Sequence, residues 1–262
     1  AVEGALRPVA LDTDRSGRHY VATAGVGRVL RLTAASAATP AEAARPSAPP
    51  TGMALRRRDH ALFVATGGPT IEVHRSGRTR PATLDAGRSV TLLRVDASGV
   101  LRAASGNGVL AFDEAKAGPP TPLGPDGADV LSFDADARGR VRAVVRNGDA
   151  RQVVVSGTAG ASPLAAGRGL GADALLSPRA LRFASDGTTW VAAEPTTPEG
   201  AALTRFSPDG TPLGTLPRLG LALLLGKDED AAVPAIVDLA PGPDGLLWVL
   251  LESGALFGVR PF

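Results

Sequence analysis

A frame of about 40 residues repeats along the whole chain. Each copy is an apolar run, a polar turn that closes on glycine, and a second apolar run, as in "VLSFDADARGRVRAVV" (130–145). The turn position is occupied in successive copies by Gly17, His60, Gly99, Gly139, Gly187 and Gly245. Each such unit buries its apolar faces only against its neighbours, so six copies indicate one repeat array in which consecutive units pack together.

The copies predict short β-strands. Two apolar runs joined by a tight turn, whose glycine can adopt a positive φ, read as a hairpin, and a third run often follows, as at 27–33 and 255–260. The runs do not alternate between apolar and polar, which is typical of strands that are buried on both faces. A helical solenoid has a similar period, but frequent Gly (32) and Pro (22) would interrupt its helices at about 1–3 kcal/mol each. The sequence therefore predicts an all-β, six-bladed β-propeller that fills residues 1–262 as a single domain.

The two ends of the chain predict how the ring closes. The last copy stops after three strands, while a short apolar stretch (1–6) precedes the first copy. We expect this N-terminal stretch to pair as the outer strand of blade six, which would remove an open sheet edge. The chain begins at Ala1 without methionine, so we expect a mature form or an excised domain of a larger protein.

Composition excludes some classes of function. The net charge is only +2, and the pI of about 9.6 reflects a slight arginine excess, so nucleic-acid binding is not expected. The absence of cysteine excludes disulfides and thiolate metal sites. No stretch of eighteen apolar residues is present, so we expect no membrane span. An extracytoplasmic location, periplasmic or secreted, is our expectation for the domain.

Two stretches carry a resemblance to known families. "SPRALRFASDGTTWVAAE" (177–194) with "ALTRFSPDGTPLG" (202–214) resembles an NHL-type repeat, and residues 236–262 are similar to blades of NHL and streptogramin-lyase-like propellers. Such families include partner- or ligand-binding sensor domains, RNA-binding domains, streptogramin lyases and calcium-dependent lactonases. The resemblance implies the fold and leaves the activity open.

Acidic residues of blades five and six are the first candidate site. Glu194 and Glu252 each follow a tryptophan by four residues, at matching positions where the second strand ends. Two carboxylates on adjacent blades could hold a cation or act as an acid/base pair, unless they are solvated strand ends. Asp238 interrupts an inner apolar run and needs a partner if it is buried, for which Arg179 is our candidate.

The long connection between blades five and six (214–234) is the second candidate. It joins an apolar stretch to an acidic tip, and it belongs on the same face as Glu194 and Glu252. If they are exposed, its leucines form a partner or ligand contact; alternatively they form the outer strand of blade five and a packed turn. The candidate residues of this connection are Leu221, Leu224, Asp228 and Asp230.

Other motifs favour structural interpretations. The segments 12–17 and 134–139 begin like calcium loops, but the acid expected at the twelfth position of the first is Thr23, so aspartate capping of the turn explains both better. The three histidines share no spacing typical of a metal site or a triad.

Three functions remain, of which the first is favoured. The sequence predicts a non-enzymatic binding or scaffold propeller, a sensor-type domain for a protein or a small ligand, without a cofactor. The alternative is a cation-dependent lactonase or streptogramin-lyase-like enzyme that uses Glu194, Asp238 and Glu252. RNA binding is the weakest, because aromatic residues make up only 4% of the chain.

Overall fold

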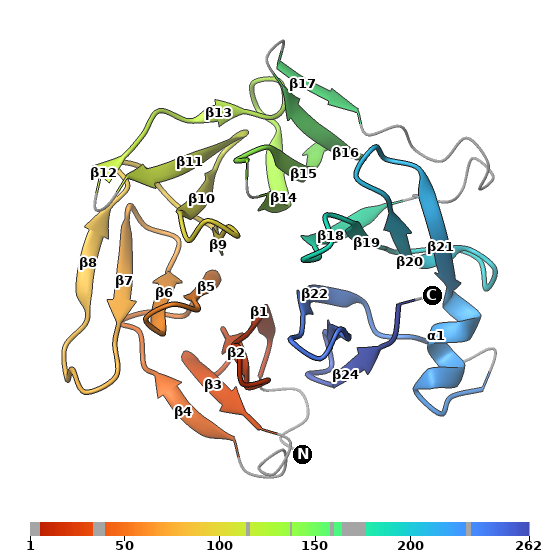
Figure 1. Cartoon of the computed structure of the whole chain (residues 1–262), viewed down its shortest axis with the longest axis horizontal. Coiled ribbons are helices and arrows are strands. Elements are labelled where there is room, and N and C mark those ends of the chain that lie inside the picture. Colours follow the sequence, from red (N-terminus) through yellow and green to blue (C-terminus); the bar gives the residue numbers. More distant parts are fainter. Residues whose placement is uncertain are drawn as a thin grey trace.

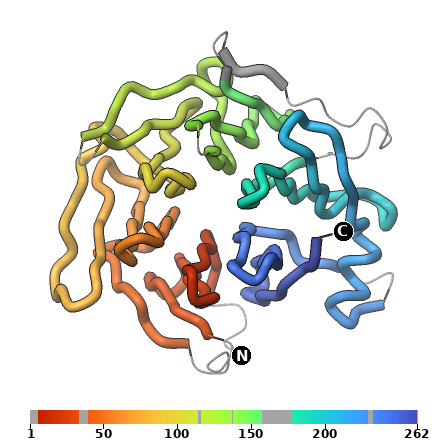
Figure 2. The backbone as a smooth tube through the Cα atoms, viewed as in Figure 1, coloured from red at the N-terminus to blue at the C-terminus, as the bar shows by residue number. Residues whose placement is uncertain are grey.

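The computed structural model contains six small antiparallel sheets arranged around a central axis (Figure 1). It describes residues 6–33, 40–113, 116–136, 138–157, 160–163, 177–228 and 232–261. Each sheet uses strands that are consecutive in the sequence, and the tube in Figure 2 runs once around the ring from blade one to blade six. The predicted six-bladed β-propeller is confirmed.

The strands of the first three blades are ordered from the axis outward. Blade one has β1 (Pro8–Thr13), β2 (His19–Thr23), β3 (Arg28–Leu32) and β4 (Ala41–Ala44). Blade two has β5 (Gly52–Arg56), β6 (Ala61–Ala65), β7 (Thr70–His74) and β8 (Ala82–Asp85). Blade three has β9 (Leu92–Val95), β10 (Leu101–Ser105), β11 (Gly108–Asp113), β12 (Lys116–Ala117) and β13 (Thr121–Pro122).

The last three blades follow the same order. Blade four has β14 (Asp129–Ala135), β15 (Val141–Asn147), β16 (Ala150–Gly157) and β17 (Gly160–Pro163). Blade five has β18 (Pro178–Phe183), β19 (Thr189–Ala193), β20 (Ala201–Phe206) and β21 (Pro212–Pro217). The helix α1 (Arg218–Leu224) leads to blade six, which has β22 (Ile236–Pro241), β23 (Leu247–Leu251) and β24 (Leu256–Val259). Within the described residues, no helix has the length and apolar character that crossing a membrane requires.

The apolar core lies between the blades. In the described residues each of the six interfaces between neighbouring blades has its own cluster of buried side chains, including Leu11, Val21, Ala240 and Leu250 between blades six and one. The inner strands also contact their neighbours around the ring, β22 with β1 included. Burial on both faces explains why the sequence runs do not alternate.

The predicted closing strand falls mainly on residues 1–5, which lie outside the described residues. In the described part, blade six has three strands. Leu6 and Arg7 pair with blade one, because their carbonyl oxygens accept hydrogen bonds from the backbone N–H groups of Gly25 and Ala24.

The hairpin turns between the first two strands of each blade are built as expected. The turn glycines have positive φ, for example +74° at Gly17 and +87° at Gly99. The carboxylate of Asp14 accepts hydrogen bonds from the N–H groups of Ser16 and Arg18, and that of Asp136 caps its turn in the same way. These contacts favour turn capping over a calcium loop.

The equivalent turn in blade two contains His60 and is strained. This histidine takes the position of the glycine with φ of +53°, a region that costs a non-glycine residue about 1 kcal/mol. We expect His60→Gly to raise the free energy of unfolding by about 0.5–1 kcal/mol, measured by urea denaturation. Gly17→Ala is the matched control and should lower it, because the alanine would meet the same strain without any clash. Equal stability of His60→Gly and the parent protein would contradict this reading.

Candidate functional site

Glu194 and Glu252 occupy equivalent positions, as predicted. Their backbone N–H groups donate to the carbonyls of Ser177 and Ala235, 3.1 and 2.9 Å away, just beyond β19 and β23. The Glu194 carboxylate lies between two guanidinium groups, with Oε1 2.7 Å from Nε of Arg179 and Oε2 3.1 Å from Nη1 of Arg151. Glu252 is exposed. Arg179 therefore pairs with a different acid than expected.

Asp238 is almost fully buried, with 2% of its surface exposed. Its Oδ1 is 2.8 Å from Nη2 of Arg94, and its Oδ2 is 3.3 Å from Nη2 of Arg182. The backbone N–H of Leu11 also donates to Oδ2, at 2.8 Å. Arginine pairing of this carboxylate was expected, but Arg179 was the wrong partner: the side chains that reach Asp238 come from the inner strands β9 and β18.

Asp238 belongs to a buried cluster of charges along the central axis. The inner strands contribute three acids and two arginines: Asp12, Asp134, Asp238, Arg94 and Arg182. Each acid accepts a hydrogen bond from the inner strand of the next blade, through the N–H groups of Leu55, Phe183 and Leu11 respectively. The cluster therefore fastens three of the blade interfaces.

Arg182 donates hydrogen bonds to backbone carbonyls as well as to a carboxylate of this cluster. It donates to the carbonyls of Leu239 and Leu11, each at 2.6 Å. Burial disfavours its charged form, but the nearby carboxylates outweigh burial and raise the pKa of Arg182. By contrast, burial dominates at Asp134 and raises the pKa of that carboxyl. Burial also dominates at Arg94 and lowers the pKa of that guanidinium, so within this cluster the neighbouring charges outweigh burial at Arg182 but not at Asp134 or Arg94.

The connection between blades five and six forms a helix rather than more strand. β21 ends at Pro217, and α1 follows it at the outer rim (Figure 1). Leu221 is buried, whereas Leu223 and Leu224 are 58% and 59% exposed. The condition of exposure is therefore met by Leu224 but not by Leu221, whose burial fits the alternative of a packed segment. Asp228 is exposed, and Asp230 lies outside the described residues.

The described residues contain no group of three or more His, Asp or Glu side chains placed to hold a metal ion. His19 is instead packed in the structure, with its ring centroid 4.1 Å from that of Trp248 and its Nδ1 3.0 Å from Oγ1 of Thr13. Burial lowers the pKa of His19, although Asp244 and Asp14 oppose this effect.

This lowered pKa predicts a loss of stability in mild acid. Below about pH 6.5 the unfolded chain protonates His19 while the folded chain resists, so the unfolded state binds more protons and is favoured. We expect the free energy of unfolding to fall as the pH is lowered from 7.5 through this window. His19→Phe, which retains an aromatic ring beside Trp248, should show a flatter dependence. An identical pH profile for both proteins would contradict the assignment.

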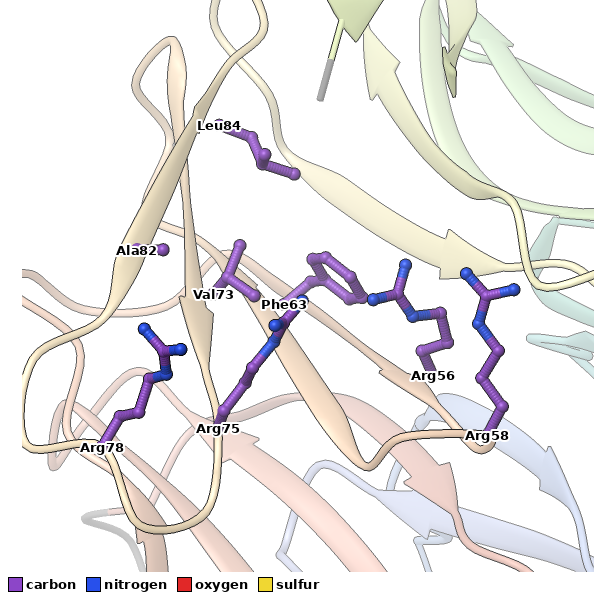
Figure 3. Close-up of a pocket in the computed structure, with 8 residues that line it drawn as sticks. All are labelled: Arg56, Arg58, Phe63, Val73, Arg75, Arg78, Ala82 and Leu84. Atoms are coloured by element: carbon purple, nitrogen blue, oxygen red, sulfur yellow. The ribbon is translucent and has the colours of Figure 1, made fainter. Parts of the chain in front are cut away.

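An arginine-lined cavity lies on the face of the ring opposite to Glu194 and Glu252 (Figure 3). The β5–β6 and β7–β8 turns of blade two emerge on this face. The cavity measures about 370 Å³, and a second cavity of about 220 Å³ continues toward blade three. The two share Arg56, Arg58 and Phe63. This cavity was not predicted from the sequence, although three consecutive arginines at 56–58 are a visible signal.

Comparison with known proteins supports the fold. No protein family matches the chain, and no curated protein matches it either. Solved structures do match. Virginiamycin B lyase from Staphylococcus aureus is 11% identical, with a TM-score of 0.61 over 96% of this chain and 80% of that one. The resemblance is one of fold.

Two further structures widen the range of functions on this fold. A protein assigned as a gluconolactonase is 14% identical, with a TM-score of 0.64 over 99% of this chain and 92% of that one. A chain of the mitotic checkpoint complex is 12% identical, with a TM-score of 0.61 over 97% and 87%. The predicted likeness to streptogramin-lyase-like six-bladed propellers is confirmed, and it spans enzymes and an assembly component alike.

Proposed function

We propose that the chain is a non-enzymatic binding or scaffold propeller rather than a cation-dependent enzyme. One observation carries this proposal: arginines already pair with two of the three carboxylates that would hold a cation. Glu194 is bound by Arg151 and Arg179, and Asp238 by Arg94 and Arg182. A cation would have to displace a guanidinium group from each carboxylate, which leaves a buried charge unpaired in the case of Asp238.

The face that carries Glu252 and α1 is the surface we propose for a protein or small-ligand partner. The exposed leucines Leu223 and Leu224 supply apolar area there, and Asp228 adds an acidic group beside them. The fold's presence in the mitotic checkpoint complex supports use in an assembly. We further propose an extracytoplasmic location, which secretion of the full-length gene product would support.

Metal titration separates this function from the enzymatic alternative. We expect calcium, magnesium, manganese and zinc to leave the melting temperature unchanged, because arginines already pair with Glu194 and Asp238 and leave Glu252 as a single exposed carboxylate. The measurement is a thermal shift on the parent protein, on Glu194→Ala/Glu252→Ala, and on the matched control Glu199→Ala/Asp149→Ala. A metal-dependent increase that disappears only in the first double variant would favour a lactonase or a streptogramin-lyase-like enzyme instead.

A further inference from the structure

Two hairpin turns of blade two bring four arginines around one apolar cavity. Arg56 and Arg58 come from the end of β5 and the turn that follows it, and Arg75 and Arg78 come from the turn between β7 and β8. Figure 3 shows the Phe63 ring between these two pairs. The two turns are separated in the sequence by β6 and β7, and the fold of the blade brings them to the same end, which concentrates positive charge there.

The floor of the cavity is the open end of the core between blades two and three. Phe63 and Val73 are buried members of that core, and Leu84 packs against it. The adjoining cavity extends the apolar floor to Leu101 and Phe112 of blade three. A ligand that enters the first cavity therefore meets apolar side chains below and guanidinium groups at the rim, whereas the adjoining cavity is also lined by Ser98 and Asp113.

The arginines of the rim differ in their freedom to bind a ligand. Arg56 is fixed by Asp59, through Nε to Oδ1 at 2.9 Å and Nη2 to Oδ2 at 2.7 Å, and its guanidinium lies 5.2 Å from the Phe63 ring centroid. In the part of the chain that the structure describes, no carboxylate is paired with Arg58, Arg75 or Arg78. These three groups carry the available positive charge.

We propose that this groove, formed by the two cavities, binds a small amphiphilic anion, with a carboxylate or phosphate head on the arginines and an apolar body against Ala82 and Leu84. Guanidinium groups match the planar, multidentate geometry of such heads. A cavity of about 370 Å³ is within the usual range for small ligands. Because Phe63 is only 2% exposed, the apolar surface that a ligand can reach comes mainly from Ala82 and Leu84. This inference deepens the proposed binding function and rests on it.

The test uses 1-naphthyl phosphate as the probe, with inorganic phosphate and 1-naphthol as its separate halves. Isothermal titration should show saturable binding of the whole probe, with a dissociation constant of about 1 mM or below, and much weaker binding of either half. Added salt should weaken the binding, because charge pairing supplies part of the affinity. Saturable binding of phosphate alone with equal affinity would overturn the proposed apolar subsite.

Two variants assign the binding to this groove. The triple variant Arg58→Ala/Arg75→Ala/Arg78→Ala should lower the affinity for the probe at least about tenfold. The control Arg15→Ala/Arg88→Ala/Arg260→Ala removes the same charge from other exposed positions and should leave the affinity unchanged. Ala82→Leu, at an exposed position that lines the cavity, should weaken naphthyl phosphate by narrowing the apolar subsite. An equal loss in both triple variants would overturn the proposal, as would tighter binding of an acidic peptide than of the probe.

The metal and anion titrations concern opposite faces of the ring. A failure of the anion to bind would overturn this groove and leave the metal result standing. A metal response that depends on Glu194 and Glu252 would overturn the proposed function, whatever the anion does.

Discussion

Replacing Asp238 with alanine should lower the free energy of unfolding by about 3–5 kcal/mol, the largest effect we expect from a single substitution. The substitution removes the carboxylate that pairs with Arg94 and Arg182 and leaves both guanidinium groups buried. In the described part of the chain, Nε of Arg94 already lacks a hydrogen-bond partner. The N–H of Leu11 would also lose its acceptor. Urea denaturation measures the change.

Two further variants test whether the loss of the buried negative charge causes this drop in stability. Asp238→Asn retains an oxygen that can accept from Leu11 but loses the negative charge, so its stability should lie between those of the alanine variant and the parent. Asp129→Ala removes an exposed acid paired with Arg146 and should cost no more than about 1 kcal/mol. If Asp238→Ala costs as little as Asp129→Ala, the axial cluster does not hold the blades together. The asparagine variant keeps this test usable if the alanine variant does not fold.

The blade architecture was predictable because it rests on local, repeated features. Apolar runs on either side of a turn and a turn residue with positive φ recur in all six copies, and this residue is glycine in five of them. The repeat is therefore recognisable even where one copy departs from the pattern. His60 shows how strongly the frame holds, since a non-glycine residue adopts the turn geometry at this position. The equivalence of Glu194 and Glu252 followed from the same register.

Contacts across the ring were not predictable from the repeat. Asp238 pairs with Arg94, 144 residues away, because both side chains point to the axis from inner strands. Arg179 is closer to Asp238 in sequence than Arg94 is, but it lies where β18 begins and reaches Glu194 instead. The groove on blade two was missed for a similar reason. In the sequence its arginines look like solvated residues of two separate turns, and they come together only because both turns emerge on one face of the ring.

The helix α1 was missed because its leucine run was interpreted as strand or packed turn. The segment follows Pro217, where β21 ends, and its seven residues include one buried pair and one exposed pair. Leu221 and Ala222 face the protein, while Leu223 and Leu224 face solvent. Helical periodicity over seven residues is a weak signal in a chain that otherwise favours strands.

Gly52→Ala should lower the free energy of unfolding by about 2–3 kcal/mol because the inner strands of blades two and three approach closely at this glycine. A Cβ at this position would lie 2.7 Å from the carbonyl oxygen of Thr91 and 2.9 Å from Cα of Leu92. Both are main-chain atoms, so the contact is relieved only if β5 and β9 move apart. The core between these blades would then be disturbed. Thermal and urea denaturation measure the loss.

Two comparisons make the cause of this loss testable. Gly68→Ala is the control for a glycine with open space around it, and it should change stability by no more than about 0.5 kcal/mol. Trimming the neighbouring side chain in Gly52→Ala/Thr91→Gly should not restore stability, because the clashing oxygen belongs to the main chain. Recovery in that double variant would show that side-chain crowding, and not the backbone spacing of the two blades, requires glycine at position 52.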